Sequence, residues 1–128
     1  MLDSSAVLAV LLDEQDGEAI LEKIKTTSPL LMSAANVLEC AMRLAPRPGE
    51  DRTSILDRML IGLPVQIMTV DETQLRLARE GFFAYGKGRH PAGLNFGDCF
   101  AYALARSRDA PLLFIGNDFR QTDIKAAM

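Results

Sequence analysis

Residues 91–105 read PAGLNFGDCFAYALA, and this stretch decides more about the fold than any other segment of the 128-residue chain. Its proline and glycine are typical of a loop, which ends where the apolar residues take up helical spacing. Asn95 and Asp98 stand three residues apart, as in a capping box, so we expect a helix to begin at Asn95. Asp98 points away from the expected apolar face, which comprises Phe96, Cys99, Phe100, Ala103 and Leu104.

A second informative stretch follows at residues 112–124, which read LLFIGNDFRQTDI. The apolar run 112–115 is short and unbroken, which is typical of a strand buried on both faces. Gly116 and Asn117 are typical turn residues, so Asp118 is expected just beyond the end of this strand. A last short strand is expected near Ile124.

Upstream, short apolar runs alternate with helical patterns in the same way. Further strands are expected at residues 1–3, 30–32 and 65–70. Further helices are expected at residues 4–12, around Ile20 and Ile24, at 33–45 with Ser33 as cap, around 55–60, and at 71–83 behind a cap at Asp71. This alternation predicts an α/β fold in which a mainly parallel sheet is covered by helices on both faces.

The composition limits the class of protein. A length of 128 residues with 48% hydrophobic content fits one globular domain, residues 1–128. The net charge of −3 argues against passive binding of nucleic acid through Lys and Arg, but not against metal-assisted chemistry on phosphates. The isolated Cys40 and Cys99 argue against a zinc site. Neither a signal peptide nor a membrane-spanning run is recognisable, so a cytoplasmic protein is expected.

Four acidic residues are expected at one edge of the sheet. Asp3 and Asp118 each follow a strand, Asp98 lies at a helix start, and Glu39 lies about one turn inside the 33–45 helix. Because ligands of parallel sheets bind beyond the carboxyl ends of the strands, these carboxylates are expected to converge there. On the 33–45 helix, Asn36, Glu39 and Arg43 are expected on the face opposite the apolar one, which comprises Val37, Leu38, Ala41, Leu44 and Ala45.

A divalent cation would explain why these acids gather. Neighbouring carboxylates raise one another's pKa values, and a bound cation relieves their repulsion. Mg²⁺ and Mn²⁺ prefer oxygen ligands, and either ion can activate a water molecule to attack a phosphodiester. The acids therefore favour metal-dependent phosphodiester hydrolysis.

Each acid also has a purely structural interpretation. Asp3 could be a helix N-cap, and Asp98 could complete the capping box at the start of its own helix. Glu39 could form an i, i+4 ion pair with Arg43, and Asp118 could be a turn residue. These interpretations stay open at the level of the sequence.

The two quoted stretches resemble known motifs. Residues 91–105 resemble the third acidic motif of VapC-like toxins, which have a PIN domain, and residues 112–124 resemble their C-terminal motif. Residues 3–8 are similar to the first motif and residues 33–39 to the second. The resemblance covers nearly the whole chain in order, although only Met1 and Leu2 stand where the family has a longer first strand.

The resemblance implies a three-layer α/β/α sandwich and a Mg²⁺- or Mn²⁺-dependent ribonuclease, the toxin of a toxin–antitoxin pair. It also implies an RNA substrate, a cognate VapB-type antitoxin and a homodimer. Carried over to this chain, the metal-site acids are Asp3, Glu39, Asp98 and Asp118. Candidate supporting residues are Ser4, Ser5, Asn36, Asn117 and Asp123.

A basic loop is a further candidate site. Lys87 and Arg89 follow the expected 71–83 helix and could contact RNA phosphates, although a solvated loop is the simpler explanation for them. For the whole chain, the competing functions are a catalytically idle interaction domain and a nuclease acting on DNA. A phosphatase with an Asp nucleophile usually needs Asp-x-Asp, and Ser5 stands where the second acid is required.

Overall fold

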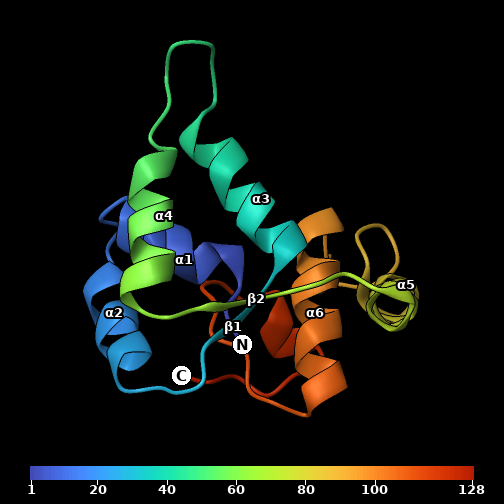
Figure 1. The fold of residues 1–128 in the computed structure, drawn as a ribbon. Coiled ribbons are helices and arrows are strands. Elements are labelled where there is room, and N and C mark those ends of the chain that lie inside the picture. Colours follow the sequence, from blue (N-terminus) through green and yellow to red (C-terminus); the bar gives the residue numbers. More distant parts are fainter.

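The structure is a computed structural model that describes every residue of the chain, 1–128, and its helices and strands alternate along the sequence (Figure 1). The elements are α1 (Ser4–Leu11), α2 (Gly17–Lys25), β1 (Leu31–Ser33), α3 (Ala34–Leu44), α4 (Thr53–Gly62), β2 (Gln66–Met68), α5 (Glu72–Tyr85), α6 (Phe96–Arg108) and the 3₁₀ turn η1 (Phe119–Gln121). All six expected helices are present. Asp71 caps α5 by accepting a hydrogen bond from the Gln74 N–H at 2.9 Å, whereas Ser33 precedes α3 without any side-chain capping bond.

The sheet is parallel and has the first residues of the chain at its centre. Strands β1 and β2 pair in parallel. Leu2 forms parallel bridges to Met32 of β1 on one side and to Leu113 on the other, and Leu112 in turn bridges Ala126. The expected strands at 1–3 and 112–115 are therefore present as short bridges, and the last pairing occurs at Ala126, two residues beyond the predicted Ile124.

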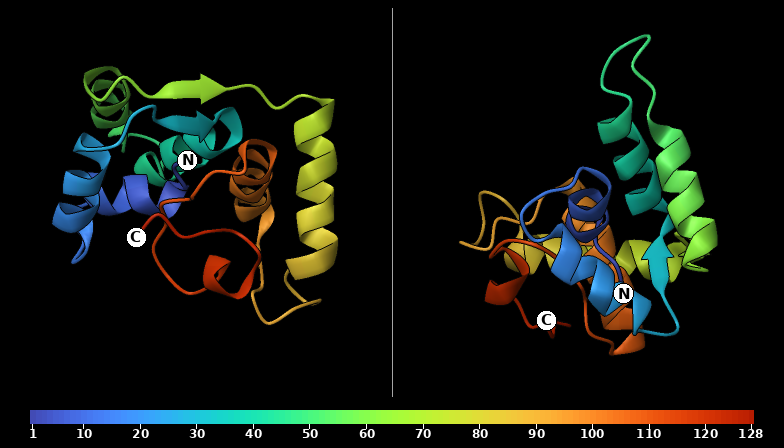
Figure 2. Two further views of the ribbon diagram at one scale, coloured as in Figure 1. Left: turned by 90° about the horizontal axis from the view of Figure 1, so that it is seen from below. Right: turned by 90° about the vertical axis from the view of Figure 1, so that its left-hand side faces the viewer.

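Two separate cores show that the sheet is the middle layer of three. One core joins Leu2 and Leu113 to residues of α1, α2, α3 and α4. The other joins Leu112 and Phe114 to residues of α5 and α6. Because neighbouring residues of a strand point to opposite faces, Leu112 and Leu113 belong to different cores. Helices α1, α2 and α4 accordingly lie on one side of β1 and helices α5 and α6 on the other (Figures 1 and 2).

The predicted apolar faces of α3 and α6 were wrong in part. On α3 the buried residues are Asn36, Cys40 and Leu44, while Leu38 is 61% exposed. On α6 Phe96 is 81% exposed, and the buried residues are mainly small. The reason is that α6 lies between the sheet and α5, so close approach favours alanine where hydrophobicity alone favours phenylalanine. No helix in the structure is long and apolar enough to cross a membrane.

Candidate functional site

A small polar cavity lies where the chain leaves the centre of the sheet. Asp3 follows the doubly bridged Leu2, and α3 begins directly after β1, so both segments bring polar residues to the same edge. The cavity has a volume of about 180 Å³. It is lined by Asp3, Ser4, Ser5, Leu8, Glu39, Arg43, Asn95 and Asp98. The structure therefore brings together three of the four predicted acids.

Asp3 is firmly held although it stands near the start of the chain. Its N–H donates to the Leu113 carbonyl at 3.0 Å, and its side chain is only 3% exposed. Its Oδ2 caps α1 by accepting hydrogen bonds from the Ser5 N–H, at 3.0 Å, and from the Ser5 hydroxyl. The Ser5 hydroxyl also accepts the Ile115 N–H at 3.0 Å. The capping interpretation is thus confirmed for Oδ2, whereas Oδ1 is buried without any partner.

Glu39 is held by hydrogen bonds and not by an ion pair. Its Oε1 accepts from the Ser4 hydroxyl and, at 3.3 Å, from Nδ2 of Asn36. Asn36 is fully buried and also donates to the Gly97 carbonyl at 2.9 Å, which ties α3 to the start of α6. Arg43 forms no ion pair with Glu39, so the structural alternative for Glu39 was wrong. Burial of an amide that positions an acid explains why the buried face of α3 begins with asparagine.

Asp98 combines a capping role with an unusual acidity. Its Oδ2 accepts the Asn95 N–H and the Asn95 Oδ1 accepts the Asp98 N–H, both at 2.9 Å, which confirms the predicted capping box. Burial, together with the negative charges of Asp3, Asp118 and Glu39, raises the pKa of Asp98 from 3.8 to about 7 against the opposing effect of the hydrogen bond from the Asn95 N–H. Burial likewise raises the pKa of Asp3. The ionised forms of Asp3 and Asp98 are therefore both destabilised in the folded protein.

This donor set fits a divalent cation. It offers an unpaired buried carboxylate oxygen on Asp3 and a neighbouring acid whose ionised form is destabilised by like charges. No three His, Cys, Asp or Glu side chains form a ready-made cation cage, because Glu39 is turned onto Ser4 and Asp98 onto Asn95. Mg²⁺ commonly needs only one or two carboxylates, with water and substrate oxygens completing its coordination.

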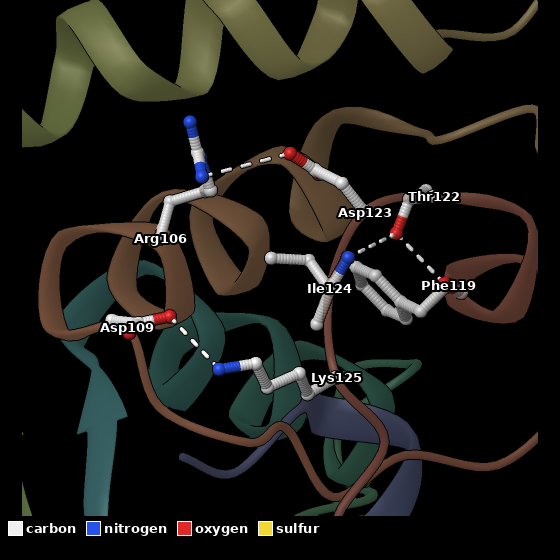
Figure 3. A network of polar contacts seen from close by, with 7 residues as sticks. All are labelled: Arg106, Asp109, Phe119, Thr122, Asp123, Ile124 and Lys125. Atoms are coloured by element: carbon white, nitrogen blue, oxygen red, sulfur yellow. Dashed lines mark hydrogen bonds and ion pairs between the residues drawn. The ribbon is translucent and has the colours of Figure 1, made fainter.

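The remaining predicted residues lie outside the cavity. Asp118 and Asn117 are exposed in the segment before η1, although Asp118 lies near enough to raise the pKa of Asp98. Asp123 does not line the cavity and pairs with Arg106 of α6 at 3.7 Å (Figure 3). Asp118 thus lies outside the cavity but within electrostatic range of Asp98, and Asp123 makes a contact with α6.

The basic loop between α5 and α6 lies beside a separate groove. The Arg89 guanidinium stands 5.0 and 4.8 Å from the ring centres of Phe82 and Phe83. Lys87 lines an apolar groove between the two helices, and Asn95 lines both this groove and the acidic cavity. The loop is therefore neither fully solvated nor in the cavity itself.

Two further residues of the site have only weak signals in the sequence. Arg43 is exposed, forms no ion pair and lines the cavity, where it is the only cationic side chain. Its position four residues after Glu39 indicates that the two side chains lie on the same face of the helix. Gly97 leaves room for Glu39, because a β-carbon at position 97 would overlap the Glu39 carboxylate. A glycine in the first turn of a helix is the only sequence signal for that contact.

The raised pKa of Asp98 predicts a pH-dependent stability. A folded-state pKa of about 7 against an ordinary 3.8 means that the folded protein binds this proton more tightly. The free energy of unfolding in EDTA should therefore fall as the pH rises from 3.8 through about 7, and this loss should be smaller in Asp98→Asn. Denaturant unfolding between about pH 5 and pH 8 measures this. Added Mn²⁺ should stabilise the wild type more at the upper end, because protons compete with the metal. A flat profile in EDTA would contradict the assignment.

Comparison with known proteins gives a consistent result. A family model described as PIN domain matches residues 1–125. "VapC ribonuclease Mb0640" of Mycobacterium bovis is 44% identical over 124 residues, which cover 97% of this chain and 95% of that protein. "Ribonuclease VapC" of Mycolicibacterium smegmatis is 44% identical over 126 residues, 98% of each chain. "Ribonuclease VapC28" of Mycobacterium tuberculosis is 40% identical over 129 residues, which cover 100% of this chain and 97% of that protein.

Proposed function

Because this chain belongs to the PIN domain family, with relatives named VapC ribonucleases, we propose that it is a divalent-metal-dependent endoribonuclease and the toxin of a toxin–antitoxin pair. The observation that carries the proposal is the unpaired, buried Oδ1 of Asp3 beside the like-charged Asp98. A buried carboxylate oxygen without a partner is costly unless a ligand satisfies it.

Asp3, Glu39 and Asp98 would hold the cation, with Asp118 at the rim. When bound, Mg²⁺ or Mn²⁺ would lower the pKa of a water molecule and neutralise charge on the phosphodiester. Ser5 fixes the Asp3 carboxylate through Oδ2, which leaves Oδ1 without a partner in the protein and free to accept a cation as its ligand.

The remaining polar residues have roles that follow from their places. Ser4 and Asn36 orient Glu39. Arg43 lines the cavity without an acidic partner and would bind a phosphate oxygen of the RNA. Lys87 and Arg89, further along the surface, would contact the RNA backbone, and Asn117 would support Asp118.

Exposed apolar side chains support protein partners. Leu38 and Met42 of α3 and Ile61 of α4 are 61%, 65% and 81% exposed. Exposed apolar side chains of this size are typical of surfaces that bind other proteins when they form a patch. We assign these helices to contacts with a cognate VapB-type antitoxin and with a second copy of the chain, in the cytoplasm, where its RNA substrate is available.

A cleavage assay with controlled metal tests the enzymatic proposal. The purified chain should cut RNA in Mg²⁺ or Mn²⁺, and EDTA should abolish the cutting by removing the cation that the acids hold. Single-stranded DNA of the same sequence should stay intact. Cutting that persists in EDTA would refute the metal-dependent mechanism. Cutting of DNA in place of RNA would select the alternative nuclease, and absence of cutting with every substrate and metal would favour the idle interaction domain.

A further inference from the structure

The groove between α5 and α6 is a feature that the acidic cavity does not explain. Its volume is about 410 Å³, within the range of pockets that hold small molecules. Three phenylalanines line it, Phe82 of α5 and Phe96 and Phe100 of α6. Phe96 is 81% exposed and meets Phe100 edge to face, with ring centres 5.0 Å apart. An aromatic ring this exposed contributes little to the core and is available to a ligand.

Charge identifies the kind of ligand that the groove would take. Arg79 and Lys87 line the groove and form no ion pair. Arg89 lies over the Phe82 ring at 5.0 Å from its centre. Exposed aromatic rings beside unpaired cations are the combination that binds single-stranded nucleic acid, since the rings stack on bases and the cations meet phosphates.

The groove also adjoins the acidic cavity. Asn95, the residue that caps α6, lines both. Phe96 follows it directly and stands two residues before Asp98. An RNA strand with one phosphate at the acids would therefore carry a neighbouring base past Phe96.

We propose that this groove binds an unpaired nucleobase of the RNA, next to the phosphate that is cut, by stacking on Phe96. The proposal rests on the assigned ribonuclease function and names the part of the substrate that the groove recognises. The position of the groove beside the acids favours RNA over a protein segment as the occupant. A stacked base also implies that the enzyme acts on single-stranded RNA or loops, where bases can leave the helix.

The test measures RNA binding without cleavage. Fluorescence anisotropy with a short single-stranded RNA, in EDTA and at low salt, reports the affinity of the full chain. Phe96→Ala should weaken binding roughly 5- to 100-fold, the range for losing one base–aromatic stack. Phe96→Leu should weaken it similarly because it keeps apolar surface but loses the ring. Phe96→Tyr should bind within about twofold of the wild type. Ile67→Ala is the control, since Ile67 is 52% exposed on β2, lies outside the groove and belongs to no surface assigned to a partner.

Several results would overturn the proposal. Wild-type affinity in Phe96→Ala, or in Phe96→Leu, would exclude stacking at this position. If Phe96→Ala changes the oligomeric state measured by light scattering and leaves the RNA affinity unchanged, the groove is an interface between copies of the chain and not a base-binding site. Failure of the wild type to bind RNA at low salt would also overturn it. The nuclease function is tested by the metal-dependent cleavage assay and not by this binding assay. A failure of the groove proposal therefore does not decide whether the chain is a nuclease.

Discussion

Asp98→Asn is expected to reduce RNA cleavage by more than about 100-fold, equivalent to about 2.7 kcal/mol of transition-state stabilisation. The substitution removes a negative charge from the group that would hold the cation, but the asparagine oxygen can still accept the Asn95 N–H that Asp98 accepts at 2.9 Å. Loss of an acid from the first turn costs about 0.3–1 kcal/mol through the helix dipole. Relief of repulsion from Asp3, Asp118 and Glu39 offsets part of that cost. The free energy of unfolding should therefore stay within about 1 kcal/mol of the wild type.

Asp98→Ala is the comparison that separates the two roles of this residue. It removes both the charge and the capping oxygen, so it should lose the same activity and, in addition, about 1 kcal/mol of stability. Initial rates of cleavage and denaturant unfolding measure the two effects independently. Full activity in Asp98→Asn would show that the residue serves only as a cap.

The order of helices and strands could be predicted from local patterns. Helical spacing and capping residues such as Asp71 and Asn95 act within one turn, so a single sequence contains their signal. The apolar run at 112–115 predicted a strand buried on both faces, and Leu112 and Leu113 do enter different cores. The predictions that failed concerned the burial of single side chains, such as Phe96 and Leu38. Their burial depends on how closely another helix approaches.

The candidate site could likewise be predicted in part from the sequence. Asp3, Glu39 and Asp98 could be placed at one edge because the topology of a parallel sheet dictates that edge. That Asn36 is buried to hold Glu39 depends on the packing of α3 against α6 and has no local signature. The predicted supporting role of Asp123 stays a prediction, and its pairing with Arg106 is a long-range contact that the motif did not indicate.

Gly97→Ala is expected to impair cleavage about 10- to 100-fold although it touches neither substrate nor cation, the usual range when support for a metal ligand is lost. An added methyl group would overlap the Glu39 carboxylate, which must then move away from Ser4 and Asn36. Because that carboxylate is the flexible end of a long side chain, the fold should tolerate the change. Alanine also favours a helix over glycine by up to about 1 kcal/mol.

Two further variants decide whether Gly97 acts through Glu39. Gly62→Ala at the end of α4 is the control, since a β-carbon there meets nothing within 4 Å, and its activity should equal the wild type. Glu39→Asp shortens the acid by one methylene and makes room beside Ala at position 97. If the contact is the cause, the double variant should lose less activity than the two single losses multiplied together. Simple multiplication of the losses would mean that Gly97 matters for the helix start alone, and that the proximity of Glu39 has no catalytic consequence.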